Sequence, residues 1–160
     1  MVSTPPAPPQ NCWLRDELTH SPPRLTVAVI LLVGADAALL EGIAQALAAA
    51  GRQVLTAASL AEASFLAAAA APLLAVVDRT LLTSAASVRG MGLAPGGALV
   101  AFGDPATPMP GPVRRAVLAE LRLPLERARL LALVAHVEAR AHVTGRDRQS
   151  PTPPESRQRV

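Results

Sequence analysis

Apolar residues follow two alternating patterns along the chain, and the first is a set of short unbroken runs. Runs of this length, rich in Val, Leu and Ile, are typical of strands that are buried on both faces of a parallel sheet. The runs predict five strands, at residues 26–33, 53–57, 73–77, 98–102 and 119–123.

The second pattern lies between these runs, where apolar positions recur every three or four residues as on a half-buried helix. Asp36 can cap the first such stretch and Gly51 can end it, while Ser59 and Glu62 form a capping box for the second. The stretches predict helices at residues 37–50, 60–70, 83–90 and 125–141.

Proline interrupts the alternation once, in the segment 104–112, which contains four prolines. Because proline breaks helices, at best a turn at 113–117 can connect the fourth and fifth strands. Alternating strands and helices imply right-handed crossovers. The pattern therefore predicts an α/β fold with three layers, a doubly wound five-stranded parallel sheet whose helix between strands four and five is reduced.

The two ends of the chain lack this pattern and are rich in Pro, Ser and Arg. With little apolar surface to bury, we expect the leader 1–24 and the tail 143–160 to be disordered, leaving one domain at 25–142.

Composition excludes several functions. All fifteen basic residues are Arg, so mechanisms that need a lysine are absent. The region 25–142 has nine Arg and eight acidic residues, which gives no basic footprint for nucleic acid. Cys12 is the only cysteine, as expected in a reducing cytoplasm, and the longest strand-like run is too short to cross a membrane. We expect a cytoplasmic protein that binds neither nucleic acid nor membrane.

The stretch 30–78, ILLVGADAALLEGIAQALAAAGRQVLTAASLAEASFLAAAAAPLLAVVD, carries a resemblance. An apolar strand, a helix closing on Gly51, a strand with Val54 and Ala57, an AEA helix and a strand ending in Asp78 follow one another without a gap. This spacing resembles the receiver domain of bacterial response regulators, the CheY-like superfamily. The resemblance implies the CheY-like, flavodoxin-like fold and a place in two-component phosphorelay signalling.

The family's chemistry is phosphoryl transfer onto the aspartate that ends the third strand, which Asp78 resembles. A divalent cation, held in part by an acidic pair after the first strand, neutralises the developing charge. Gly34 and Ala35 stand at the positions of that pair. Asp36 could approach a cation if the turn rearranged, but a helix N-cap needs no rearrangement. We expect Mg²⁺ only if Asp78 is phosphorylated, and no other cofactor.

Three further family positions have changed. Phe102 replaces the hydroxyl that ends strand four, Glu120 the aromatic residue of strand five, and Leu123 the lysine before Pro124. The resemblance therefore implies a degenerate receiver, or pseudo-receiver, without enzymatic activity. Asp78 can still be phosphorylated weakly, or its carboxylate can cap the following turn or pair with Arg79.

The function predicted from these residues is a phosphorylation-independent protein-interaction module. Arg114, Arg115 and Arg122 form a candidate surface for a protein partner, such as a histidine kinase, another signalling protein or a second copy of the chain. One alternative is a stand-alone receiver that is still phosphorylated on Asp78. A more distant alternative, a degenerate dinucleotide-binding domain of Rossmann type, is opposed by Leu40, which would block the approach to a pyrophosphate.

Overall fold

The computed structural model describes residues 27–147, so the predicted leader and the tail beyond Asp147 lie outside the described residues. A single sheet of five strands, in the order β2-β1-β3-β4-β5, forms the middle layer, and every pairing is parallel. The strands are β1 (Val29–Val33), β2 (Gln53–Ala57), β3 (Leu74–Asp78), β4 (Ala98–Phe102) and β5 (Val117–Leu121).

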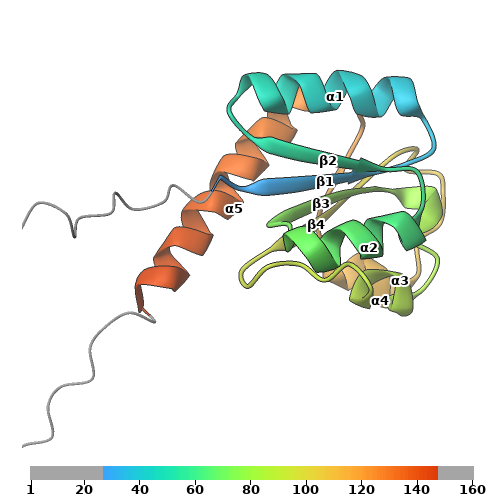
Figure 1. Ribbon diagram of the computed structural model, residues 1–160. Helices are drawn as coiled ribbons and strands as arrows, with labels where there is room; N and C mark the ends of the chain where they lie inside the picture. The colour runs from blue at the N-terminus through green and yellow to red at the C-terminus, as the bar shows by residue number, and fades with distance from the viewer. Residues whose placement is uncertain (1–26, 148–160) are drawn as a thin grey trace, which may run out of the picture.

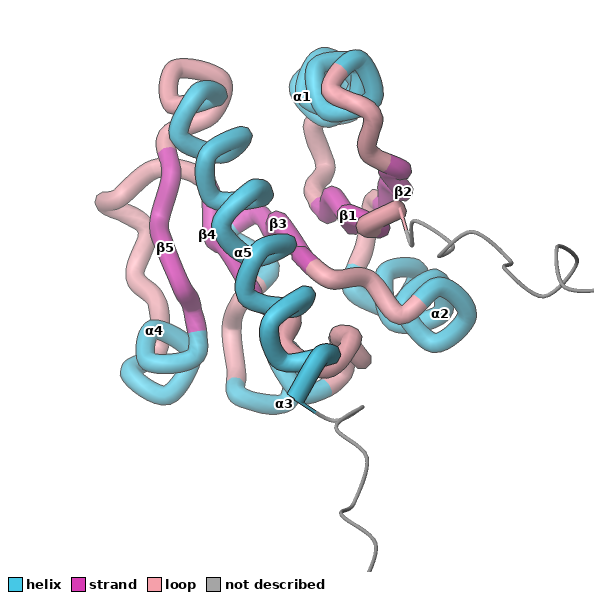
Figure 2. The backbone as a smooth tube through the Cα atoms, turned by 90° about the vertical axis from the view of Figure 1, so that its left-hand side faces the viewer, coloured by secondary structure: helices cyan, strands magenta, loops and turns pink. Residues whose placement is uncertain are grey.

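Helices cover both faces of the sheet (Figure 1). The elements around it are α1 (Ala37–Ala49), α2 (Leu60–Ala70), the 3₁₀ turn η1 (Arg79–Leu81), α3 (Ala85–Arg89), α4 (Gly111–Ala116) and α5 (Arg127–Asp147). Helices α1 and α5 pack on one face, and α2, α3 and α4 pack on the other. Figure 2 shows α1 and α2 on opposite sides of β1 and β2.

Alternation along the strands divides the core between these faces. In β1, Ile30 and Leu32 pack with α1 and α5, whereas Leu31 and Val33 pack toward α2. All four side chains are fully buried because β1 lies inside the sheet with helices on both sides. The unbroken apolar runs of the sequence are a direct consequence of this double burial.

The predicted fold class is confirmed, but the bounds of several elements differ from the prediction, most of all those of α5 and β5. Helix α5 continues to Asp147, past the predicted end at 141, because the polar residues after Ala141 include no proline before position 151 and are compatible with helix. Strand β5 begins at Val117, which pairs with Leu99 directly after α4, and it ends before Leu123. The crossover is short, as predicted, but it is a six-residue helix, α4, and not a turn at 113–117; it begins at Gly111 because Pro112 lies in the first turn, where proline is tolerated.

The strand order also distinguishes between the two folds that the sequence predicts, the flavodoxin-like fold and the Rossmann alternative. Order 2-1-3-4-5 is that of flavodoxin-like folds, whereas classic dinucleotide-binding domains have 3-2-1-4-5-6. The distant Rossmann alternative therefore has no support in the topology. None of the helices between residues 27 and 147 combines the length and apolar character that a bilayer-spanning helix needs.

An ion pair ties the start of β2 to α5 near the amino ends of the strands. Arg52 donates from Nε to Glu138 Oε1 (3.1 Å) and from Nη2 to Glu138 Oε2 (2.8 Å). The hydrogen bond to this carboxylate raises the pKa of Arg52 above its usual value. The bidentate contact fixes the position of α5 against the outer strand β2.

Candidate functional site

The candidate site is the carboxyl edge of the sheet, where all five parallel strands end together. Asp78 is the last residue of β3, Phe102 the last residue of β4, and Gly34 directly follows β1. The sheet register places Asp78 beside Phe102. Crevices at this edge are the usual ligand sites of open α/β sheets.

The carboxylate of Asp78 is engaged by the turn that follows it. Its Oδ1 atom accepts hydrogen bonds from the backbone N of Thr80 (2.9 Å) and from Thr80 Oγ1 (2.8 Å). Asp78 is thus the N-cap of η1, one of the two structural roles that the sequence predicts. The predicted pairing with Arg79 is not observed, since Arg79 pairs with Glu120 instead.

The residues after β1 do not offer a cation the acidic pair that the receiver resemblance implies. Gly34 and Ala35 carry no carboxylate, and Asp36 Oδ1 accepts from the backbone N of Leu39 (3.0 Å) as the N-cap of α1. Within residues 27–147, no three acidic, His or Cys side chains come together in a way that could hold a metal ion. The described side chains therefore do not fit the Mg²⁺ site of the family.

The ring of Phe102 fills the space next to Gly34. Phe102 is 4% exposed and packs in the same apolar cluster as Leu40 and Leu121. A Cβ atom at Gly34 would lie only 3.1 Å from Phe102 Cζ, closer than side chains normally approach. An apolar ring thus occupies the region beside the missing acidic pair, and it cannot donate a hydrogen bond to a phosphoryl oxygen.

An ion pair with a buried guanidinium and a partly exposed carboxylate crosses the same edge, from the end of β3 to β5. Arg79 is 5% exposed and is the only buried charged or polar side chain among the described residues. Its Nη1 donates to Glu120 Oε2 (2.6 Å) and its Nε donates to the carbonyl oxygen of Thr107 (2.6 Å). A buried guanidinium needs such partners, so the pair joins the end of β3 to β5 and to the Pro-rich segment.

Sequence reasoning missed this contact because it considered Arg79 and Glu120 separately. The sequence predicts a pairing of Arg79 with its neighbour Asp78, and it identifies Glu120 as the residue at the family's aromatic position. The predicted fifth strand, 119–123, places Glu120 near its start, whereas the observed β5 ends at Leu121 and brings Glu120 to the carboxyl edge, where Arg79 follows β3. Leu123, at the position of the family's lysine, is half-buried against the apolar core.

A groove of about 560 Å³ opens beside this ion pair, at the ends of β4 and β5 and the start of α5. Its charged lining residues are Arg79, Glu120, Arg122, Glu126 and Arg129. The backbone N of Arg122 (2.6 Å) and Arg129 Nη1 (3.1 Å) donate to Glu126, and these hydrogen bonds lower the pKa of Glu126 below its usual value. Glu126 is therefore anionic at neutral pH.

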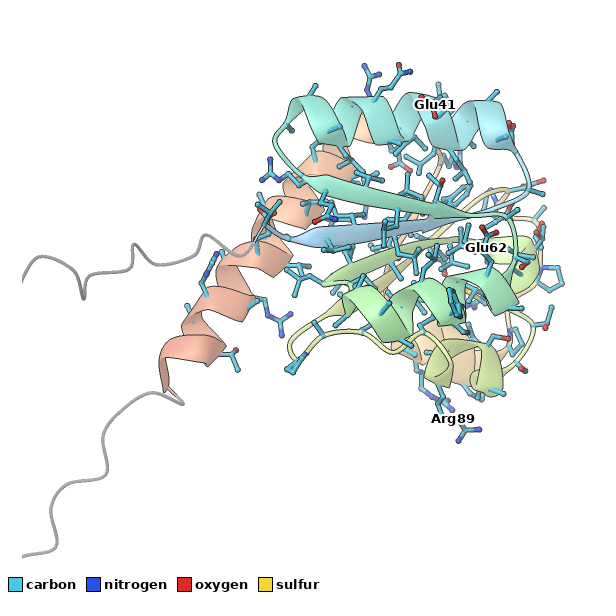
Figure 3. The ribbon with its side chains drawn as sticks, in the orientation of Figure 1. Glu41, Glu62 and Arg89 are labelled. Atoms are coloured by element: carbon cyan, nitrogen blue, oxygen red, sulfur yellow. The ribbon has the colours of Figure 1, made fainter. Side chains whose placement is uncertain are left out.

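A smaller hollow of about 270 Å³ lies next to Gly34, between α1 and α2. Figure 3 shows the two acidic side chains at its sides, Glu41 and Glu62. Both carboxylates already accept hydrogen bonds, Glu41 from Gln45 (2.9 Å) and Glu62 from the backbone N of Ala58 (2.8 Å). Half of the capping box predicted for α2 is observed: Ser59 Oγ accepts from the backbone N of Glu62 (3.2 Å), whereas the Glu62 carboxylate reaches the residue before the N-cap instead of Ser59 itself.

The arginines predicted to form a partner surface are all exposed. Arg114 and Arg115 lie in the last turn of α4, and Arg122 follows β5. Arg114 Nε is 4.0 Å from Glu120 Oε1, while Arg115 and Arg122 form no ion pair with another described residue. The structure thus places three accessible guanidinium groups around the outer strand β5.

Comparison with known proteins gives a clear result for the fold. No family model matches the sequence, and no curated protein matches it. Among solved structures, a response regulator receiver domain protein from Clostridium thermocellum superposes with a TM-score of 0.59 at 18% identity, covering 74% of this chain and 99% of that one. The CheY-like receiver domain from Methylobacillus flagellatus gives 0.60 at 16% identity, covering 69% and 98%.

The chemotaxis response regulator CheY4 of Vibrio cholerae is similar too, with a TM-score of 0.56 at 20% identity over 69% of this chain and 98% of that chain. These likenesses extend across nearly the whole length of the receiver domains. Together with the strand order, they show that this chain has the CheY-like receiver fold.

Proposed function

We propose that the chain is a receiver-like domain of two-component signalling that acts by binding other proteins, independently of phosphorylation and without enzymatic activity. The main support for this proposal comes from the residues that stand at the carboxyl edge of the sheet. Asp78 caps its own turn, the positions of the acidic pair hold Gly34 and Ala35, and Phe102 fills the adjoining space. The receiver fold therefore lacks the groups on which its usual chemistry depends.

The electrostatics of phosphoryl transfer support the same proposal. Charge on the transferring group must be compensated by a cation or by fixed donors. The nearest guanidinium in sequence, Arg79, is directed to Glu120 and Thr107, and no lysine exists in the chain. Asp78 would have to accept a phosphoryl group without this compensation.

The arginine surface supports an interaction role. Arg114, Arg115 and Arg122 are exposed around β5, a strand at the edge of the sheet. We propose that they contact an acidic face of a protein partner, a histidine kinase or another signalling protein, or a second copy of this chain. A cytoplasmic location belongs to the proposal, since a single cysteine permits no disulfide within the chain.

Intact-mass analysis with acetyl phosphate and Mg²⁺, with Asp78→Asn beside the parent chain, tests the proposal. A receiver domain that retains its acidic pair serves as the positive control. We expect the control to gain a phosphoryl group and the parent chain to gain none. An adduct that appears in the parent and disappears in Asp78→Asn would overturn the proposal and establish the alternative, a receiver that is still phosphorylated on Asp78.

A further inference from the structure

The groove beside β4 and β5 has a buried guanidinium in its wall. Arg79 uses Nε and Nη1 for hydrogen bonds to Thr107 and Glu120, while its Nη2 has no partner among the described residues. No buried side-chain nitrogen or oxygen in residues 27–147 is left without a partner, so Nη2 must remain accessible. Because Arg79 lines the groove, a ligand in the groove can reach Nη2.

The charges around the groove leave one positive charge in excess. Its lining has three arginines and two glutamates. Glu120 is paired with Arg79, and Glu126 with Arg129, whereas Arg122 has no ion-pair partner within the described part of the chain. The two carboxylates would repel a ligand with two negative charges, so the arrangement favours a single negative charge.

Apolar surface lies beside these charges. Phe102 and Leu121 contribute to the wall of the groove, and Leu125, which is 87% exposed, stands at its margin. The volume of about 560 Å³ is within the range of small-molecule sites. A ligand with a short apolar body could cover Leu125 while its anionic end reaches Arg79.

We infer that this groove is a binding site for a monoanionic carboxylate carried by a short apolar body, with the Nη2 group of Arg79 as its anchor. This Nη2 group, free of partners within the described residues, carries two N–H donors, and a charged N–H donor forms a strong, charge-assisted hydrogen bond to a carboxylate oxygen. Arg122 and Arg129 add long-range attraction at the margin of the groove. The carboxylate can belong to a free organic acid or to a glutamate beside leucines in another protein. This inference does not rest on the proposed function.

The test is an NMR titration that follows the backbone amides of Gly103 and Arg122, which line the groove. The probes are hexanoate, hexan-1-ol as its neutral match, inorganic phosphate, and the peptide acetyl-Leu-Glu-Leu-amide with its Gln analogue. We expect saturable shifts with hexanoate, none with hexanol, and weaker binding of phosphate. Binding of the Glu peptide alone, without its Gln analogue, would assign the carboxylate to a protein side chain.

Two double variants with the same change of charge test the location. Arg122→Gln/Arg129→Gln should weaken hexanoate binding about three- to tenfold, as expected for partly exposed charges. Arg89→Gln/Arg140→Gln is the matched control, since both arginines are exposed and neither lines the groove; Figure 3 shows Arg89 on α3. The control should bind as the parent does.

A third variant, Arg79→Gln/Glu120→Gln, removes the anchor and its partner together and should abolish binding, with circular dichroism to check the fold. If it fails to fold, the first pair of variants still decides the matter. Three results would overturn the inference: no saturable shift with hexanoate or the Glu peptide, equal weakening in both double variants, or phosphate binding as tightly as hexanoate.

Discussion

Two Arg–Glu ion pairs cross the domain, one near each edge of the sheet, and they differ in their surroundings. Near the amino edge, Arg52 and Glu138 are 25% and 22% exposed, so both side chains are partly hydrated. At the carboxyl edge, Arg79 is 5% exposed whereas Glu120 is 40% exposed. If either residue of the first pair is replaced, water can hydrate the charged group that remains. The second cannot lose Glu120 without leaving a buried guanidinium short of a partner.

The comparison predicts its largest effect for Glu120→Ala. Loss of this carboxylate leaves Arg79 with only the carbonyl of Thr107 among its described hydrogen-bond partners. Because Glu120 is partly exposed and water can enter, we expect a loss of about 1–3 kcal/mol in the free energy of unfolding. Urea denaturation measures this loss. Glu120→Gln, which keeps an acceptor oxygen, should lose less, and an equal loss in both variants would contradict the explanation.

Close packing at the carboxyl edge predicts the next effect, for Gly34→Ala. The new Cβ would lie 3.1 Å from Phe102 Cζ, and overpacking of this kind costs about 1–3 kcal/mol. Gly42→Ala is the matched control, because nothing lies within 4 Å of a Cβ there and alanine favours the helix α1. Thermal unfolding should show opposite signs for the two variants. A stable Gly34→Ala chain would mean that Phe102 moves aside freely.

The ion pair near the amino edge should give a smaller effect. Removing it with Glu138→Gln is expected to lower the free energy of unfolding by about 0.5–1 kcal/mol, since both partners are partly hydrated. Raising the salt concentration should reduce the difference from the parent chain, because exposed charges are screened. Urea denaturation at low and high salt measures both values. A loss as large as that of Glu120→Ala would remove the contrast between the two edges.

The smallest effect is expected from pH, through Glu126. Hydrogen bonds from Arg122 and Arg129 lower its pKa in the folded chain below the ordinary value of 4.5. The stability that this shift contributes is present above pH 4.5 and is lost as the pH falls through the lower, folded pKa. Glu126→Gln should therefore be less stable than the parent at neutral pH, and the two should converge in acid. Urea midpoints of both chains across this pH range measure the convergence. If the two plots of stability against pH run parallel, Glu126 is not the source of the pH dependence.

Much of the fold can be predicted from local patterns in the sequence, such as helix caps and apolar runs. The bounds of α2, β2 and β4 agree with the prediction because caps or turns delimit each of these segments. Asp36 and Ser59 cap their helices as predicted, since an N-cap needs only a side-chain oxygen and the backbone a few residues ahead.

The candidate site was less predictable because it depends on contacts between distant residues. Arg79 and Glu120 are 41 residues apart; Arg79 directly follows β3 and Glu120 lies in β5, and these two strands are not neighbours in the sheet. Their meeting depends on the strand order and on the path of the Pro-rich segment, whose Thr107 carbonyl accepts from Arg79. Neither is fixed by local periodicity. The change at Phe102 was visible in the sequence, but its packing against Gly34 was not.

The contact between Phe102 and position 34 also limits which single substitutions the domain can accept during evolution. An aspartate introduced at Gly34 would bring its Cβ against the phenyl ring, so a first step toward an acidic pair is opposed before any cation can bind. A smaller residue at 102, introduced first, would instead leave a cavity in the core. Each path begins with a destabilised intermediate, and the two positions must therefore change together.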